Sequence, residues 1–235
     1  MKILICGGSG LLGSNLIDYF FKTNEIILYT QNRRQITLPG KKINVDLAAD
    51  MAPLAKHDFD VLINCVAFTN VDECETNPKL AYRLNAWLPQ QLAKLCKKNK
   101  ALLVQISTDQ IFAGRAKTYR ETAPASPINV YGKTKLLAER LVRQVLPTNS
   151  LILRTNLFGI NLQPKQSLSE WVIDSLVAKA TISMFTNVWF NPLLVNTLAG
   201  IIHRCITHNI TGIYNCGVDD RVSKYQFGKL IKKEF

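Results

Sequence analysis

The chain has 235 residues, 47% of them hydrophobic, and its 29 lysines and arginines outnumber 17 acidic residues, for a net charge of +12. This length and apolar content suffice to bury a core, which excludes a disordered or fibrous chain. No apolar run approaches the ~18 residues of a membrane-spanning helix. The charge favours anionic small-molecule partners over nucleic acids, because no nucleic-acid-binding motif accompanies it.

Apolar runs alternate with helical patterns along the whole chain, which predicts an α/β fold built on a doubly wound parallel sheet. The six cysteines lack Cys-x-x-Cys spacing and the three histidines are scattered. We therefore expect reduced thiols, a cytoplasmic protein and no metal site. Strands are predicted at 2–6, 25–30, 43–45, 59–65, 101–107, 149–154 and 212–215, and helices at 11–22, 77–98, 127–146, 167–179, 193–208 and 223–234.

The first strand runs directly into a glycine-rich turn, Gly7-Gly-Ser-Gly10-Leu-Leu-Gly13, and a helical pattern follows. This is the context that a dinucleotide-binding loop requires, because glycine lets a pyrophosphate approach the main chain. The helix start adds unpaired N–H groups and the positive end of the helix dipole. The alternative is a tight turn without a ligand. The predicted cofactor-binding residues here are Gly7, Ser9, Gly10, Leu11 and Leu12.

The end of the second strand carries information on which nicotinamide cofactor is used. An acidic residue at this place typically binds the ribose 2′-hydroxyl of NAD. The chain instead reads Thr30-Gln-Asn-Arg33-Arg34. Arginine suits a 2′-phosphate through charge-assisted hydrogen bonds. We therefore predict that Arg33 and Arg34 select NADPH, with NADH as the alternative if both arginines are solvated surface residues.

A third group of residues predicts proton-transfer chemistry. The strand at 101–107 ends in Ser107-Thr108-Asp109, and ligands in such sheets bind beyond the carboxyl ends of the strands. Ser126-Pro127 predicts the start of the next helix, with the serine as N-cap. Tyr131 and Lys135 would then lie one turn apart on that helix.

The spacing of Tyr131 and Lys135 predicts an activated tyrosine. An ammonium at ~4 Å with an effective dielectric of ~20 is worth ~4 kcal/mol, which could lower the Tyr131 pKa by about three units. Such a tyrosine can donate a proton to a carbonyl oxygen while Thr108 hydrogen-bonds the same oxygen. Thr108, Tyr131 and Lys135 are the predicted catalytic residues. Tyr225 and Lys229 share the spacing but follow no Ser-Thr pair, so we interpret them as a pair packing on the core.

Taken together, these segments resemble the extended short-chain dehydrogenase/reductase superfamily and, within it, the dTDP-4-dehydrorhamnose reductase (RmlD-like) family. The resemblance runs over about the first 160 residues and continues more weakly to Arg221-Val-Ser-Lys-Tyr. The segments that carry it are Gly7-Gly-Ser-Gly-Leu-Leu-Gly13, Val45-Asp-Leu47, Asn64-Cys-Val-Ala67, Thr69-x-Val-Asp72-x-x-Glu75, Ser107-Thr-Asp-Gln-Ile-Phe112, Tyr131-Gly-Lys-Thr-Lys135 and Leu153-Arg-Thr155.

This resemblance implies a Rossmann-type NAD(P)-binding domain at 1–157 and a small, mainly substrate-binding lobe at 158–235. Members of the family run longer than this chain, so part of the substrate-binding lobe could be missing here. They often pair through helices equivalent to 77–98 and 127–146, so a homodimer is expected. The resemblance also implies that Lys135 holds the nicotinamide ribose. Further implied cofactor contacts are Asp46 and Leu47 at the adenine, Cys65, Val66 and Ala67 along the cofactor, and Ile106 and Tyr131.

The chain departs from the family pattern at two places near the predicted substrate. Gln110 stands where the reductases usually have tyrosine and the related dehydratases have a glutamate that acts as acid and base. Glutamine has no titratable proton, which argues against a dehydratase. Asn156-Leu157 stand where an aromatic residue often meets the sugar. The predicted substrate contacts are Thr108, Asp109, Gln110 and Leu157.

The function predicted from these residues is an NADPH-dependent reductase of a nucleotide-linked keto-sugar, in which Tyr131 protonates the oxygen. An epimerase would use the same three catalytic residues. A cofactor-binding regulatory subunit, similar to the beta subunit of methionine adenosyltransferase, is the third hypothesis. The intact set of Thr108, Tyr131 and Lys135 favours chemistry over regulation.

Overall fold

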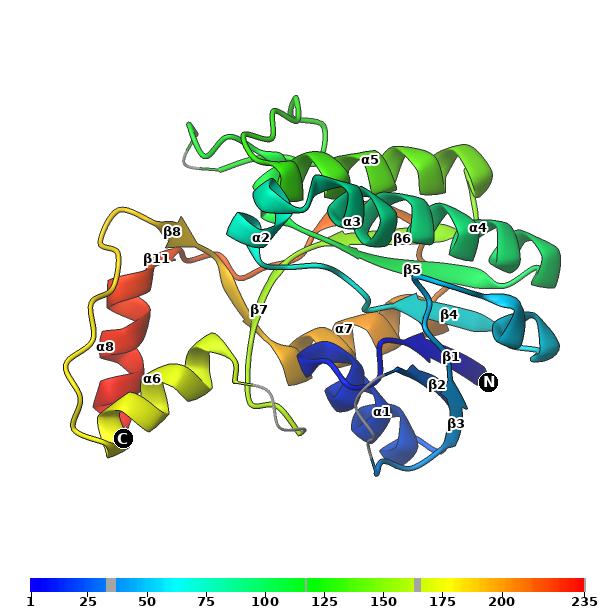
Figure 1. The fold of residues 1–235 in the computed structure, drawn as a ribbon, viewed down its shortest axis with the longest axis horizontal. Coiled ribbons are helices and arrows are strands. Elements are labelled where there is room, and N and C mark those ends of the chain that lie inside the picture. Colours follow the sequence, from blue (N-terminus) through cyan, green and yellow to red (C-terminus); the bar gives the residue numbers. More distant parts are fainter. Residues whose placement is uncertain (33–36, 117, 163–165, 235) are drawn as a thin grey trace.

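The computed structural model describes residues 1–32, 37–116, 118–162 and 166–234. Within these residues, seven parallel strands form one sheet in the order β10-β6-β5-β4-β1-β2-β3 (Figure 1). The predicted doubly wound α/β fold is thereby confirmed. The strands are β1 (Lys2–Cys6), β2 (Ile26–Gln31), β3 (Lys41–Asn44), β4 (Val61–Asn64), β5 (Leu102–Ser107), β6 (Ser150–Arg154) and β10 (Gly212–Asn215).

The central strands are nearly continuous apolar runs because helices cover both faces of the sheet. All of β4 and β6 is buried, as is β1 after Lys2. The strand order reverses between β1 and β4, where chain connections leave toward opposite faces. Such a switch point opens a crevice beyond the carboxyl ends of the strands.

Two layers of helices enclose the sheet (Figure 1). On one face α1 (Leu11–Lys22) lies beside α7 (Val195–Thr207), and both bury apolar side chains against the strands. On the other face α4 (Leu88–Asn99) and α5 (Val130–Val145) form the second half of the core. A full-length hydrophobic stripe on each helix explains why periodicity predicted these elements.

Two predicted helices differ from the structure, one in its continuity and the other in the residue at which it begins. The predicted helix at 77–98 is α3 (Pro78–Tyr82), a π-helical turn (Arg83–Trp87) and α4 in succession. Pro89 at the start of α4 has no N–H to donate, so the wider turn before it loses no hydrogen bond there. Helix α5 begins at Val130, because the Asn129 side chain, not Ser126, caps it.

The C-terminal third contributes both to the sheet and to a group of elements at the end of the molecule away from the N-terminus (Figure 1). Phe227 of α8 packs edge-on against Phe158 and Phe190, with ring centroids 5.2 and 5.3 Å apart. Tyr225 and Lys229 are exposed, so the prediction that they pack on the core was wrong. The elements of this end are α6 (Leu168–Val177), α8 (Lys224–Glu234) and the short strands β7 (Asn156–Phe158), β8 (Trp189–Phe190), β9 (Pro192–Leu194) and β11 (Val222–Ser223).

Three short helical segments were not predicted. Helix α2 (Val71–Thr76) is capped by Asn70, whose side chain accepts from the Glu73 N–H, and 3₁₀ turns occupy Ala52–Lys56 and Asp109–Ile111. Each is too short for a periodic pattern to stand out. In the part of the chain that the structure describes, no helix combines the length and apolar content needed to cross a membrane.

Candidate active site

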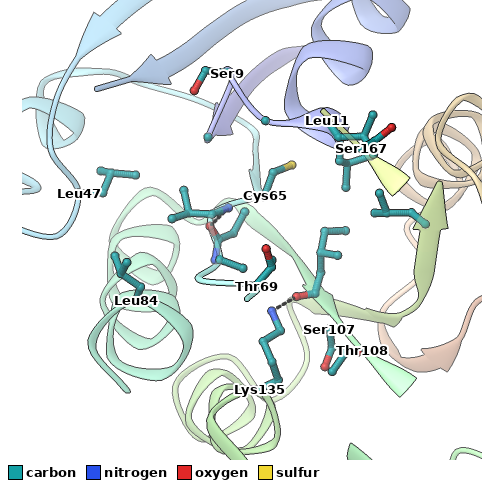
Figure 2. A pocket seen from close by; sticks show the side chains of 18 of the residues that line it. Ser9, Leu11, Leu47, Cys65, Thr69, Leu84, Ser107, Thr108, Lys135 and Ser167 are labelled. Atoms are coloured by element: carbon teal, nitrogen blue, oxygen red, sulfur yellow. Dashed lines mark hydrogen bonds between the residues drawn. The ribbon is translucent and has the colours of Figure 1, made fainter. Parts of the chain in front are cut away.

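A cavity of about 780 Å³ opens beyond the carboxyl ends of β1, β4 and β5, at the switch point of the sheet. Its volume lies in the range of sites for cofactors and small molecules. Figure 2 shows Ser9 and Leu11 on one side, Leu47 and Leu84 on another, and Thr108 and Lys135 opposite the glycine loop. The N-terminus of α6 adds Ser167 to the wall.

The glycine loop wraps from β1 into α1 and leaves its backbone open to the cavity. Gly7 takes φ +88°, a conformation that favours glycine. Its N–H donates to the Thr30 hydroxyl at 2.9 Å, which ties the loop to β2. Gly10 is the N-cap of α1 and supplies no side-chain cap, and acidic residues are absent from the first turn. The N–H groups and dipole of α1 are thus available to an anion.

We expect Gly13→Ala and Gly10→Ala to separate the folding and binding roles of this loop. A methyl at Gly13 would collide with the Gly7 carbonyl oxygen, whereas at Gly10 the same oxygen lies 3.5 Å away, an ordinary contact. Gly13→Ala should lower the free energy of unfolding by about 1–3 kcal/mol, measured by denaturant titration. Gly10→Ala should leave stability nearly unchanged and weaken pyrophosphate binding. Equal stabilities of the two variants would contradict this account.

The side of the cavity where the sequence predicts the adenosine is built from the ends of β2, β3 and β4. Thr30, Asp46 and Leu47 line it, and the Asp46 carboxylate accepts from the Ala48 N–H at 2.9 Å. Arg33 and Arg34, predicted to bind a 2′-phosphate, lie outside the described residues. The selection of NADPH by these arginines therefore stays a prediction.

The predicted catalytic residues converge on one wall of the cavity. Thr108 and Tyr131 are 4% and 9% exposed, and both line the cavity together with Lys135. The Lys135 ammonium donates to the Ile106 carbonyl at 2.5 Å (Figure 2). The Tyr131 ring packs against Cys74 and Ala81. The end of β5 and the first turns of α5 thus bring a hydroxyl, a phenol and an ammonium group to the same wall of the cavity.

The electrostatics of Tyr131 differ from the sequence-based expectation. Burial raises the pKa of Tyr131 to about 12, with a hydrogen bond to Thr108 acting in the opposite direction. Burial also lowers the pKa of Lys135 to about 8, while the Glu139 carboxylate raises it. The predicted lowering of the tyrosine pKa was wrong, because desolvation of the buried phenol is the largest effect, and the nearby Asp109 and Cys74 also raise the pKa. Tyr131 is therefore a protonated donor at neutral pH.

A buried ion pair lies beneath this wall. The Glu139 carboxylate accepts from Arg154 Nη2 at 2.7 Å and from Nε at 3.0 Å, and also from the Ser107 hydroxyl at 2.5 Å. Both charged side chains are almost inaccessible, at 7% and 3% of their surface. Arg154 Nη1 also donates to the Glu121 carbonyl at 3.1 Å, which ties this part of the chain to the ion pair. This network joins α5, β5 and β6 directly behind Thr108.

Among the predicted site residues that the structure describes, all but Asp109 line the cavity. Asp109 is absent from the lining; its carboxylate accepts from the Thr108 hydroxyl and the Asn156 amide, each at 3.2 Å. The predicted residues that the structure brings together in the lining are Gly7, Ser9, Gly10, Leu11, Leu12, Asp46, Leu47, Cys65, Val66, Ala67, Ile106, Thr108, Gln110, Tyr131, Lys135 and Leu157.

Several lining residues were missed by sequence reasoning. Asn156 and Phe158 come from β7, and Asn161 and Ser167 from the segment leading into α6. Ser167 could have been found from its capping box with Glu170, which marks a helix start, although not the direction in which that helix points. Across the described ranges, no group of three or more His, Cys, Asp or Glu side chains could hold a metal ion.

Comparison with known proteins places the chain among sugar-nucleotide reductases. It is 28% identical over 98% of its length to a probable low-salt glycan biosynthesis reductase of Haloferax volcanii, of which it covers 79%. It is 38% identical to the dTDP-4-dehydrorhamnose reductase of Streptomyces griseus, over 65% of this chain and 48% of that enzyme.

Solved structures agree with this assignment. The crystal structure of a hypothetical dTDP-4-dehydrorhamnose reductase from Sulfolobus tokodaii superposes with a TM-score of 0.88 at 30% identity, covering all of this chain and 82% of that one. A Bacillus anthracis dTDP-4-dehydrorhamnose reductase in complex with NADP shares the fold, with a TM-score of 0.86 at 24% identity. The family model described as the RmlD substrate binding domain matches residues 1–235 in full, and the chain therefore belongs to this family.

Proposed function

We propose that this protein is an NADPH-dependent reductase of a nucleotide-linked keto-sugar, of the kind that its relatives named dTDP-4-dehydrorhamnose reductase act on. The observation that carries the proposal is a single cavity bounded by both the open N-terminus of α1 and the Thr108, Tyr131 and Lys135 side chains. An anion-binding helix end beside a protonated phenol suits a dinucleotide and a carbonyl substrate at once.

The residues present suit a nicotinamide dinucleotide. Gly7 and Gly10 leave room for a pyrophosphate at the start of α1, and Asp46 and Leu47 would meet the adenine. Lys135 would hold the nicotinamide ribose. When bound, the reduced cofactor supplies the hydride that forms the new C–H bond. NADPH is favoured over NADH by the arginines that follow β2 in the sequence.

Proton transfer falls to the chain's own residues. As the carbonyl carbon accepts the hydride, the C=O π bond breaks and its electron pair goes to oxygen. Tyr131 donates its proton to that oxygen, giving the alcohol, and the tyrosinate regains a proton from solvent. Thr108 would hydrogen-bond the same oxygen. The Lys135 ammonium, one turn along α5, would stabilise the negative charge that develops on the phenol oxygen.

Turnover should fall as the pH rises through about 8, because that is where Lys135 loses its proton. Below this pH the ammonium is charged and can stabilise the developing tyrosinate; above it the charge is lost while Tyr131, with its pKa at about 12, is still protonated. A pH profile of kcat at saturating substrate measures this. A rate that stays constant up to about two pH units above the Lys135 pKa would show that Lys135 is not the group that titrates.

The stoichiometry of cofactor consumption tests the proposed function. With dTDP-4-keto-6-deoxy-D-glucose as probe, a reductase oxidises one NADPH for each sugar that it converts. An epimerase interconverts sugars with no net oxidation, and a regulatory subunit binds the cofactor without converting the sugar. One oxidised cofactor per alcohol formed is the expected result, and sugar conversion at constant NADPH absorbance would overturn it.

The division into a cofactor-binding part at 1–157 and a mainly substrate-binding part at 158–235 belongs to the same proposal. It is supported by the cavity wall, to which the later segment adds Asn161, Ser167 and Leu168. A homodimer is supported by the exposed Trp87, 51% accessible, and Ile128, 70% accessible, near the helices expected to pair. A light-scattering mass near that of one chain would contradict the dimer.

A further inference from the structure

The backbone of Gln110 is held by two contacts at the substrate side of the cavity. It belongs to the 3₁₀ turn that follows Thr108, and its backbone N–H donates to the Thr108 hydroxyl at 3.2 Å. Its carbonyl oxygen packs so closely on Gly132 of α5 that a methyl there would collide with it. The base of the side chain is therefore fixed relative to Tyr131, the neighbour of Gly132.

The N-cap of α5 decides which way the Gln110 amide faces. Asn129 Oδ1 accepts from the Gly132 N–H at 2.7 Å, so the other end of that amide, Nδ2, is a donor only. Nδ2 lies 3.2 Å from Gln110 Oε1. Because a donor requires an acceptor, the oxygen of Gln110 must face Asn129, and the amide cannot be flipped. Nε2, which has no hydrogen-bond partner in the described part of the chain, is left over.

We propose that Gln110 is a specificity residue whose orientation Asn129 fixes. The Gln110 amide would offer its N–H donors to an oxygen of the sugar beside the reacting carbonyl. This inference rests on the proposed function and names its substrate class. The site would take nucleotide-linked keto-sugars that carry a hydroxyl, carbonyl or ring oxygen at that position. It would discriminate against an ammonium group there, which has no lone pair to accept a hydrogen bond and would leave both donors unpaired.

Asn129→Asp tests the inference without altering a residue of the cavity wall. The carboxylate still caps α5 through one oxygen, but its second oxygen faces Gln110 as an acceptor. The Gln110 amide should then turn Nε2 toward the introduced carboxylate and present Oε1 to the sugar. The KM for dTDP-4-keto-6-deoxy-D-glucose should rise about tenfold, with kcat and the NADPH dissociation constant nearly unchanged.

A double-variant cycle separates this reorientation from a general disturbance of α5. Gln110→Met removes both donors and should raise the KM by a similar factor. In the Gln110→Met background, Asn129→Asp should have no further effect, because no amide is left to turn. Asn129→Ser keeps a capping hydroxyl and cannot force the flip, so it should raise the KM less than Asn129→Asp.

The outcomes distinguish this inference from the proposed function. If the unchanged protein reduces the keto-sugar but Asn129→Asp leaves its KM unaltered, the inference is wrong and the function stands. Additive effects of Asn129→Asp and Gln110→Met would also overturn it. If the unchanged protein reduces no keto-sugar although it binds NADPH, the proposed function fails and the inference falls with it.

Discussion

Replacing Glu139 by glutamine should lower the free energy of unfolding by about 3–5 kcal/mol. The substitution keeps the shape of the side chain but removes the buried negative charge. In the native protein Glu139 Oε2 lies 2.7 Å from Arg154 Nη2. The guanidinium would be left without a counter-charge, and the amide NH₂ would stand where Oε2 now accepts from Arg154 Nη2, so that two donors would face each other. Chemical denaturation followed by circular dichroism measures this loss.

Two variants serve as controls for this prediction. Asp18→Asn removes the exposed pair with Lys22, whose side chains are 42% and 70% accessible, and should cost less than about 1 kcal/mol. Removing both buried charges together, with Glu139→Leu and Arg154→Met, should recover much of the loss, because apolar groups of similar size need no counter-charge. A Glu139→Gln variant as stable as Asp18→Asn would show that the buried pair does not stabilise the fold.

Tyr131→Phe should lower kcat by about 10²–10⁴-fold, the range over which positioned proton donors contribute. The variant keeps the ring that packs on Cys74 and Ala81 and loses the hydroxyl alone. Stability and NADPH binding should therefore change little, which separates a catalytic effect from unfolding. Rates of NADPH oxidation and a cofactor titration on the same preparation measure both.

The chain supplies a matched control in Tyr225, which also precedes a lysine by four residues. Tyr225 is 47% exposed on α8 and its ring lies 5.8 Å from the Lys229 ammonium. Tyr225→Phe should leave kcat unchanged. Equal losses in the two tyrosine variants, or none in either, would remove Tyr131 from the catalytic role.

The features that sequence predicted well are those that depend on local chemistry. Strands β1 and β10 have the bounds that the sequence predicts, and the glycine turn lies between β1 and α1 as its spacing indicates. The site follows from the same logic, because parallel strands bring their carboxyl ends to one edge. Thr108 and Gly7 therefore meet in one cavity although they lie far apart in the chain.

The features that sequence did not predict depend on packing between distant segments. The pKa of Tyr131 was predicted from one neighbour, Lys135, whereas burial by α2 and α3 decides its direction. The start of α5 was assigned to Ser126 because Ser-Pro is a common start, yet Asn129 competes successfully by reaching both Gly132 and Gln110. Two- and three-residue strands such as β8 and β7 leave no periodic signal at all.

The most direct measurement of the central claim follows a deuterium label from cofactor to product. The protein is incubated with dTDP-4-keto-6-deoxy-D-glucose and NADPH that carries deuterium at both positions of nicotinamide C4, and the sugar product is analysed by mass spectrometry and NMR. The account predicts one deuterium per product molecule, bound to the carbon that was the carbonyl, and formation of this labelled product about 10²–10⁴-fold more slowly in Tyr131→Phe. A product without deuterium, formed while the cofactor is bound, would contradict hydride transfer in this site.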